Sequence, residues 1–464
     1  MRAHEAGALH ADIGQPEPSW LRPPDDVNAL VGHLWPATAA RRGDGVLTVG
    51  GIDVCTLAAE YGTPAYVLDE ADLRARCRAY RQAFDGADVF YAGKAFLCKA
   101  IVRIIAAEGL SLDVCTGGEL AVALAAGMPA ERIGLHGNNK SVYELSRALD
   151  AGVGRIVLDS FDEIDRLTAL ATERGLRPPV LVRVTVGVEA HTHEYIATAH
   201  EDQKFGFSLA GGAALAAVAK ILDDDVLDLL GLHSHIGSQI FDTSAFEVSA
   251  RRVLDLQARI RDEYGVELPE LDLGGGFGIA YTTQDDPQPP DELATGLRKI
   301  VEHECAAHGL DIPRLSVEPG RALVGPAVFT LYEVGTVKDV DGIRTYVSVD
   351  GGMSDNIRTA LYDASYSATV ASRATAAAPI LARVVGKHCE AGDIVVKDEF
   401  LPADVAPGDL LAVPGTGAYC RSMASNYNHL PRSPVVAVRQ GQAQVIVRRE
   451  TEADLLALDT GIEP

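Results

Sequence analysis

Short apolar runs alternate with longer amphipathic stretches through the middle of the chain, from about residue 71 onward. The runs are rich in Val, Ile and Leu, whereas the stretches between them, such as residues 70–84 and 160–175, repeat apolar residues at helical spacing. This alternation predicts eight strands with helices between them. The expected strands lie at residues 89–92, 110–114, 132–137, 155–158, 180–184, 229–233, 271–273 and 314–317.

Two α/β folds share this alternation, a closed (β/α)8 TIM-type barrel and an open doubly wound sheet. The pattern alone does not separate them. Eight such units in about 250 residues is the usual size of the barrel, so the barrel is the fold that we expect.

The pattern changes after about residue 325, where short strand-like runs are separated by Gly, Pro and Asp turns. It predicts a second, mostly antiparallel β domain, which the strand-like "TPAYVLDE" before the barrel also joins. The Pro-rich "TTQDDPQPPDE" is expected to be a surface loop between barrel units. The predicted organisation is an N-terminal extension at 1–45 that wraps on the body or stays loose, a barrel at 70–325, and a discontinuous β domain at 46–69 plus 326–464.

Composition narrows the class of protein. Lys plus Arg is 41 and Asp plus Glu is 65, so the formal charge is 41 − 65 = −24, which disfavours nucleic acid and anionic membranes as partners. No run has transmembrane length, and the N-terminus has no apolar signal core. The seven cysteines are scattered and form no C-x-x-C pair, so we expect neither a disulfide framework nor a zinc site. These features predict a soluble, cytoplasmic protein.

Chemically distinctive residues follow the predicted strands, where a barrel carries its active site. Lys94 follows the first strand, His235 the sixth, a glycine run at 274–278 the seventh, and Glu318 the eighth. Each has a plainer explanation by itself: a surface cation, a core imidazole, a tight turn. Together, an amine, a flat ring, a backbone cradle for phosphate and a carboxylate fit pyridoxal phosphate.

Three histidines, His191, His193 and His200, lie in a long polar segment without helical spacing. Histidine clusters can bind metals. We interpret this segment instead as an active-site loop and expect no metal.

The sequence resembles the fold-type III pyridoxal phosphate-dependent decarboxylases, most closely the members that act on diaminopimelate. The resemblance covers about residues 61–428 and leaves out the N-terminal extension. It is carried by the motifs "YAGKAF", "LDVCTGGEL", "HGNNKS", "GLHSHIGSQ", "DLGGGFG", "EPGRAL", "VDGGMSDNIRTALYDASY", "GKHCEAGD" and "GTGAYC".

The resemblance implies cofactor-binding roles for residues at the strand ends. Lys94 would be catalytic and joined covalently to the cofactor, His235 would stack on its ring, and Glu318 would face its pyridine nitrogen. Ser238 and the backbone around Gly276 would hold the phosphate. The cofactor set is Lys94, Asp113, His235, Ser238, Gly276, Glu318, Gly320, Arg321 and Tyr419.

The resemblance implies substrate-binding and proton-transfer roles for further residues. Cys389, by itself an ordinary buried thiol, would be the catalytic general acid and would reach the active site of the partner subunit in a homodimer. Glu390 would meet the distal ammonium of the substrate, and Arg321 would contact either phosphate or substrate. The substrate set is Arg321, Arg358, Tyr362, Glu390 and Tyr419.

The implied activity is that of a carboxy-lyase that converts meso-2,6-diaminopimelate to L-lysine and carbon dioxide, the last step of lysine biosynthesis. Two arginines suit a distal carboxylate, which ornithine, arginine and carboxy-polyamines lack. A decarboxylase of one of these amines on the same fold is the alternative. An alanine racemase has no need of the distal arginines, and the retained Lys94, Glu318 and Cys389 argue against a cofactor-free regulatory homologue.

Overall fold

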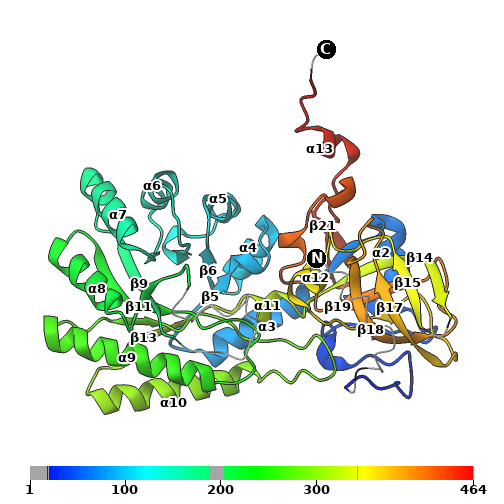
Figure 1. Ribbon diagram of the computed structural model, residues 1–464, viewed down its shortest axis with the longest axis horizontal. Helices are drawn as coiled ribbons and strands as arrows, with labels where there is room; N and C mark the ends of the chain where they lie inside the picture. Colours follow the sequence, from blue (N-terminus) through cyan, green and yellow to red (C-terminus); the bar gives the residue numbers. More distant parts are fainter. Residues whose placement is uncertain (1–17, 19, 188–202, 342, 463–464) are drawn as a thin grey trace, which may run out of the picture. The chain divides into compact units, whose positions relative to one another are not determined.

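The computed structural model describes residues 18, 20–187, 203–341 and 343–462 (Figure 1). The chain folds into two compact units. The first, here called the β unit, contains the residues up to Leu73, the segment Ile279–Asp286 and the residues from Val324 onward. The second, the barrel unit, contains Arg74–Gly278 and Pro287–Leu323. The domain boundaries drawn from the sequence stay a prediction.

The barrel unit is built on a closed parallel sheet of eight strands, which confirms the predicted (β/α)8 barrel. Each strand pairs in parallel with its neighbours, and the pairing of β8 with β9 closes the ring, so the open-sheet alternative is wrong. A short extra strand, β10 (Phe207–Ser208), adds to β9. The barrel strands are β5 (Asp88–Ala92), β6 (Ser111–Val114), β7 (Ile133–Leu135), β8 (Arg155–Leu158), β9 (Pro179–Thr185), β11 (Asp228–Ser234), β12 (Glu270–Asp272) and β13 (Arg314–Val317).

Amphipathic helices cover the outside of this sheet (Figure 1). Local sequence explains where they begin and end: Ser141 and Glu144 form a capping box at the start of α6, and Gly152 ends that helix in the left-handed conformation. The main helices are α3 (Glu70–Ala83), α4 (Lys99–Ala107), α5 (Gly117–Ala126), α6 (Val142–Ala151), α7 (Phe161–Arg174), α8 (Ala213–Asp224), α9 (Ser244–Tyr264) and α10 (Pro290–His308).

The β unit is a mostly antiparallel sheet, as predicted, with parallel pairing only at β15–β17 and β4–β20 among the described strands. Its strand from before the barrel, β4, lies between β14 and β20. The sequence analysis missed the central strand β14, whose first half is buried on both faces and so lacks alternation. The strands are β4 (Ala65–Asp69), β14 (Val328–Val340), β15 (Arg344–Val349), β16 (Thr369–Val370), β17 (Pro379–Val385), β18 (Ile394–Pro402), β19 (Leu410–Pro414), β20 (Val435–Arg439) and β21 (Gln442–Val447).

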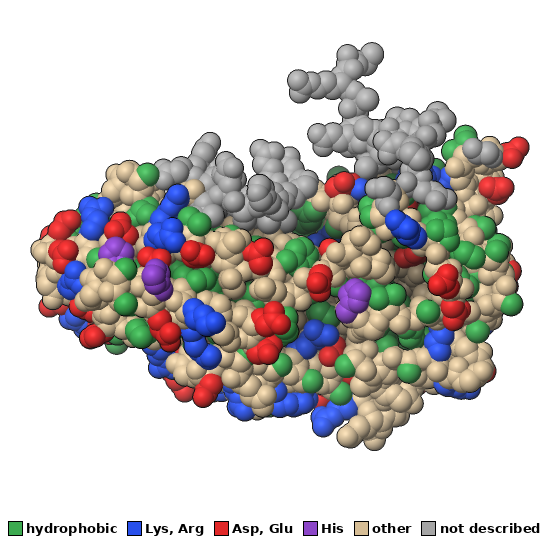
Figure 2. Space-filling model, turned by 90° about the horizontal axis from the view of Figure 1, so that it is seen from below, with side chains coloured by type: hydrophobic (Ala, Val, Ile, Leu, Met, Phe, Trp, Pro, Cys, Tyr) green, Lys and Arg blue, Asp and Glu red, His purple; other side chains and the backbone are tan. Residues whose placement is uncertain are grey.

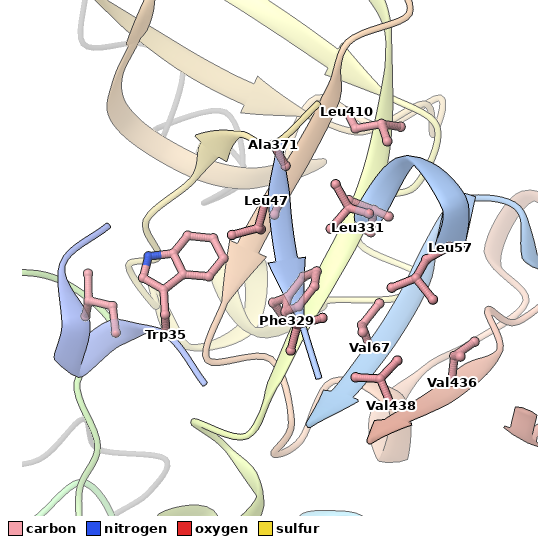
Figure 3. Packing of buried hydrophobic residues seen from close by; sticks show 14 of the residues in the cluster. Trp35, Leu47, Leu57, Val67, Phe329, Leu331, Ala371, Leu410, Val436 and Val438 are labelled. Atoms are coloured by element: carbon pink, nitrogen blue, oxygen red, sulfur yellow. The ribbon is translucent and has the colours of Figure 1, made fainter. Parts of the chain in front are cut away.

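The core of the β unit includes residues from the N-terminal segment (Figure 3). Trp35 is buried, and its ring centroid lies 6.0 Å from that of Phe329 on β14. Leu47, in the small sheet of β1 (Ala40–Arg41), β2 (Leu47–Val49) and β3 (Ile52–Asp53), packs into the same cluster. This part of the N-terminal segment therefore wraps on the β unit instead of staying loose.

The surface carries both signs of charge, and acidic and basic side chains are interspersed on the face seen in Figure 2. Within the described part of the chain, none of the helices combines the length and apolar character needed to cross a membrane.

Candidate active site

Lys94 lies on a single helical turn, η2 (Gly93–Ala95), directly after β5. The turn is fixed by the hydroxyl of Tyr91, which donates to the carbonyl oxygen of Phe96 at 2.6 Å. The neighbours Ala95 and Phe96 are buried, but Lys94 itself is exposed. The described residues therefore leave the side chain of Lys94 exposed on the turn that directly follows β5.

Glu318 follows β13 and is the buried carboxylate at the centre of the barrel's strand ends. Its Oε1 atom lies 3.1 Å from Nε2 of His136 and 3.3 Å from Nε2 of His233. Asp113 on β6 approaches the same imidazole of His136 at 3.5 Å. Oε1 of Glu318 nevertheless has no hydrogen bond of good geometry to any described residue. A buried acceptor of this kind favours a ligand that donates a proton to it.

Electrostatics gives these groups different protonation states. Burial raises the pKa of Glu318, but the two imidazoles of His136 and His233 together outweigh burial, so the pKa of Glu318 lies well below its ordinary value. Burial lowers the pKa of His136, yet the carboxylates of Asp113 and Glu318 raise it by more. Burial lowers the pKa of His233 to about 4 and raises that of Asp113 to about 6. At neutral pH Glu318 is therefore an anion and His233 is neutral.

His235 follows β11 and presents a neutral ring. Desolvation lowers the pKa of His235 well below its ordinary value, and the positive charge of Lys94 lowers it further. Its Nδ1 atom accepts a hydrogen bond from the backbone N–H of Gly275 at 3.2 Å, so the ring proton is on Nε2. Such an uncharged flat ring can stack on an aromatic cofactor.

The glycine run after β12 brings backbone segments unusually close together. Gly276 has φ of +112°, and a Cβ atom there would lie 2.5 Å from the carbonyl oxygen of Gly237, so only glycine fits. Gly320 is equally constrained, since a Cβ atom there would lie 2.9 Å from that of Ala92 on β5. Beside this run, Nη2 of Arg321 donates to Oγ of Ser238 at 2.8 Å.

In the β unit, Arg358 opens the short helix α12 (Arg358–Tyr362) and is only 6% exposed. Its Nη1 atom donates to the hydroxyl of Tyr366 at 2.5 Å, and its guanidinium carbon lies 4.7 Å from the ring centroid of Tyr281. No carboxylate of the described residues lies within ion-pair distance of it. Tyr362, at the other end of this helix, is half-buried.

Tyr419 has a backbone conformation that is rare for a bulky residue, with φ of +63°. The neighbouring Cys420 is buried, and its Sγ atom lies 3.7 Å from the hydroxyl of Tyr366. Backbone strain of this kind concentrates at functional sites. The role predicted for Tyr419 stays a prediction.

Cys389 and Glu390 lie on a loop between β17 and β18, and both are exposed. The ordinary buried thiol that residue type alone suggested is therefore not what the structure shows. Buried residues fix the loop. Asp393 accepts a hydrogen bond from the backbone N–H of His388 at 2.8 Å, and Oδ2 of Asp393 lies 2.9 Å from Nδ1 of His388. The backbone N–H of Cys389 donates to Oδ1 of Asn428 at 2.9 Å.

One group of metal-ligating side chains is present among the described residues. The nitrogen atoms of His136 and His233 and an oxygen of Glu318 lie within 4.8 Å of one another. These atoms already belong to the barrel's strand-end cluster, and we assign no metal to them. The histidines at 191, 193 and 200 lie outside the described residues.

The predicted residues thus fall into two sets, one on each unit, and sequence reasoning missed several of their neighbours. His136 follows β7 directly, so the strand-end rule used for Lys94 would have found it. His233, at the penultimate position of β11, was visible in the same way. Tyr366 ends the motif "VDGGMSDNIRTALYDASY", but nothing in the sequence links it or Tyr281 to the side chain of Arg358, because only the fold brings them together. The Pro-rich segment is a loop between β12 and α10 with several exposed residues, as predicted, although its first part belongs to the β unit.

Comparisons with known proteins identify the family of this chain. Residues 70–325 match the pyridoxal binding domain of the pyridoxal-dependent decarboxylases. A diaminopimelate decarboxylase of Mycobacterium leprae (strain TN) is 57% identical over 470 residues, covering 99% of this chain and 100% of that protein. A diaminopimelate decarboxylase of Bacillus subtilis (strain 168) is 49% identical over 426 residues, covering 91% of this chain and 97% of that protein.

Solved structures give the same result. The crystal structure of diaminopimelate decarboxylase from M. jannaschii with L-lysine has a TM-score of 0.86 at 32% identity and covers 92% of this chain and 98% of that one. The enzyme from Helicobacter pylori with L-lysine has a TM-score of 0.80 at 30% identity, covering 88% and 99%. The chain therefore belongs to the pyridoxal-dependent decarboxylase family, within its group of diaminopimelate decarboxylases.

Proposed function

We propose that this protein removes one carboxyl group of meso-2,6-diaminopimelate as carbon dioxide and leaves L-lysine, with pyridoxal phosphate as its cofactor. Membership of the family supports the reaction. The observation that supports diaminopimelate as the substrate is the buried guanidinium of Arg358, which has no carboxylate partner among the described residues. An uncompensated buried charge is costly, and a ligand carboxylate supplies the missing partner.

The barrel unit fits the cofactor. The buried Oε1 atom of Glu318 is an acceptor suited to a protonated pyridine nitrogen, and the neutral ring of His235 is suited to stacking. The backbone around Gly276, with Ser238 and Arg321, offers donors to a phosphate. Bound pyridoxal phosphate supplies an electron sink for the electron pair that remains when carbon dioxide leaves.

The remaining tasks fall to side chains of this chain. Lys94 would hold the cofactor covalently through Nζ. Glu318, kept ionised by His136 and His233, would maintain the positive charge on the pyridine nitrogen of the bound cofactor. Asp113 and Gly320 would line the cofactor. Of the two roles considered for Arg321, phosphate or substrate binding, we propose phosphate binding, because its side chain is held by Ser238.

The distal end of the substrate is bound by residues of the β unit. Arg358 takes its carboxylate, Glu390 its ammonium group, and Tyr362 and Tyr419 add polar contacts. Fixing this end orients the bond that breaks at the other end. Ornithine and arginine have a single carboxylate, the one that is lost, so they leave Arg358 without an anion.

The proton that replaces carbon dioxide comes from Cys389 Sγ. We propose that Cys389 serves the active site of the partner subunit in a homodimer, which is supported by the exposure of its thiol in the single chain. A cytoplasmic location stays a prediction, based on the scattered cysteines.

Release of carbon dioxide from meso-diaminopimelate, with and without added pyridoxal phosphate, tests the function. Ornithine, arginine and L-lysine are assayed in parallel. We expect turnover of diaminopimelate that depends on the cofactor and little turnover of the other three amines. Faster release from any of them would contradict the substrate and favour the alternative decarboxylase.

A further inference from the structure

Arg358 is held by two tyrosines that no part of the proposed mechanism uses. Tyr366 is 1% exposed and Tyr281 is 6% exposed, and their ring centroids are 5.1 Å apart in an edge-to-face arrangement. The guanidinium carbon of Arg358 lies 4.7 Å from the centroid of the Tyr281 ring and 5.7 Å from that of the Tyr366 ring. We call these two residues the tyrosine clamp.

Tyr366 fixes one edge of the guanidinium by a hydrogen bond. Arg358 can only donate, so the oxygen of Tyr366 accepts the bond from Nη1 at 2.5 Å. Sγ of Cys420 lies 3.7 Å from the same oxygen, in a contact in which either group can be the donor. Burial raises the pKa of Tyr366 well above its ordinary value, so the phenol stays neutral and does not neutralise Arg358.

Tyr281 fixes the plane of the guanidinium by a cation–π contact. Its own position is set by Asp285, whose Oδ2 atom accepts the backbone N–H groups of Tyr281 and Thr282, each at 2.9 Å. On the other side the ring packs on the end of β19, where a Cβ atom at Gly415 would lie 3.1 Å from it. The turn that contains Asp285 therefore holds Tyr281 in place.

Tyr366 reaches Arg358 because the chain reverses after α12. The helix ends at Asp363, which adopts the left-handed conformation with φ of 56° and ψ of 28°. This reversal returns a residue eight positions further on to the first residue of the helix. The clamp is thus preorganised by buried, well-packed segments of the β unit.

We propose that Tyr366 and Tyr281 are positioning residues that orient Arg358 to read a ligand carboxylate, and that they thereby set the preference for amines that carry one. The inference rests on the proposed function and deepens it. Neither tyrosine neutralises the guanidinium of Arg358. Its full positive charge therefore stays available to a ligand carboxylate. A bidentate arginine–carboxylate pair requires a fixed guanidinium plane, which is what the clamp provides.

The test compares two ligands that differ by this carboxylate. L-lysine, the proposed product, retains it, and cadaverine is the same diamine without it. Inhibition constants of both are measured on the holoenzyme of wild type, Tyr366→Phe and Tyr281→Leu. Tyr66→Phe is the matched control, since Tyr66 is another buried phenol of the β unit, whose hydroxyl donates to the carbonyl of Asp355 at 2.5 Å.

We expect Tyr366→Phe to raise the inhibition constant of L-lysine about tenfold, because a hydrogen bond to a charged group is lost. We expect Tyr281→Leu to raise the same constant about threefold, because a cation–π contact is lost. Neither should change the constant for cadaverine, and Tyr66→Phe should leave the ratio of the two constants at the wild-type value. Circular dichroism confirms that each variant is folded.

Three results would overturn the inference. If wild type prefers L-lysine to cadaverine and both clamp variants keep that preference, the clamp has no positioning role although the proposed function stands. If wild type itself shows no preference, the proposed substrate fails and the inference fails with it. Equal weakening of both ligands in a folded clamp variant also contradicts a role specific to the carboxylate.

Discussion

In the barrel unit the buried carboxylate of Glu318 lies between two imidazoles, whereas in the β unit the buried guanidinium of Arg358 lies against two tyrosine rings. The barrel supplies its carboxylate with titratable neighbours that hold it ionised. The β unit supplies its cation with neutral neighbours that orient it and leave its charge uncompensated. A charged neighbour fixes a protonation state, and an aromatic neighbour fixes a direction, so the two units suit different tasks.

This difference matches the division of labour that we propose. A cofactor that works as an electron sink needs a constant charge beside its ring. A substrate that comes and goes needs a fixed but unpaired charge, because a built-in counter-ion would compete with its carboxylate.

The largest expected effect is confined to the barrel unit. Replacing Lys94 by Ala removes the nucleophilic amine, and we expect kcat to fall at least about a hundredfold. Borohydride reduction followed by peptide mass mapping should find the cofactor on Lys94 in wild type and nowhere in the variant. Lys99 is an exposed lysine on the next helix, and the Lys99→Ala variant should behave as wild type. An adduct at another lysine would contradict the role proposed for Lys94.

Replacing Glu318 by Gln tests whether the barrel needs its charge. The side chain keeps its size, but the anion beside the proposed pyridine nitrogen is lost, and we expect kcat to fall about 10²-fold. Steady-state kinetics and the absorption spectrum of the bound cofactor measure this change.

Arg358→Gln provides the contrast in the β unit. It should mainly raise KM for diaminopimelate, because it removes a contact made before and during the reaction alike. If the two variants changed the same kinetic parameter, the division between the units would be wrong.

A pH effect on stability should come from the β unit. Burial raises the pKa of Asp355 to about 7, in spite of hydrogen bonds from Tyr332 and from the backbone of Gly352. The unfolded value is near 3.8, so the folded protein prefers the protonated acid. This stability is fully present below about pH 4 and is lost as the pH rises through about 7, by up to ~4 kcal/mol.

Asp355→Asn removes this titration while keeping the shape of the side chain. The melting temperature of wild type relative to the variant should therefore fall between pH 5 and pH 8. Asp341→Asn, at an exposed position of the same unit, is the matched control for replacing an aspartate by asparagine. A constant difference for Asp355→Asn would show that this carboxyl does not titrate in that range.

The smallest expected effect concerns the loop of Cys389. Asn428 adopts a left-handed conformation, with φ of 51°, and accepts the backbone N–H of Cys389. Asn428→Gly keeps that conformation and loses the acceptor, so we expect a two- to tenfold fall in kcat, of about the size of one hydrogen bond. The rate at which iodoacetamide alkylates Cys389 should change with it.

Asn428→Asp keeps an acceptor and should restore both properties. If the glycine variant equals wild type, the hydrogen bond does not hold the thiol. If glycine and aspartate are equally impaired, the amide group of Asn428 has another partner.

Strand-end residues were accessible to sequence reasoning because a barrel places them by a local rule. Lys94, His235 and Glu318 each follow an apolar run, and the runs are visible from their composition. The exposure of Lys94 and Cys389 was not accessible, since burial depends on every segment that packs nearby. The clamp was hidden for the same reason: Tyr281 and Tyr366 lie 77 and 8 positions from Arg358, and no periodicity links them.

The sequence by itself determined the alternation of strands and helices in the barrel, the presence of a second β domain and the residues with the chemistry for pyridoxal phosphate, because periodicity and residue type are local properties. The tertiary structure decided that β8 pairs with β9 to close the barrel, which imidazoles surround Glu318, and which rings hold Arg358. These are contacts between segments distant in the chain, and their energies depend on geometry that exists only after the chain has folded.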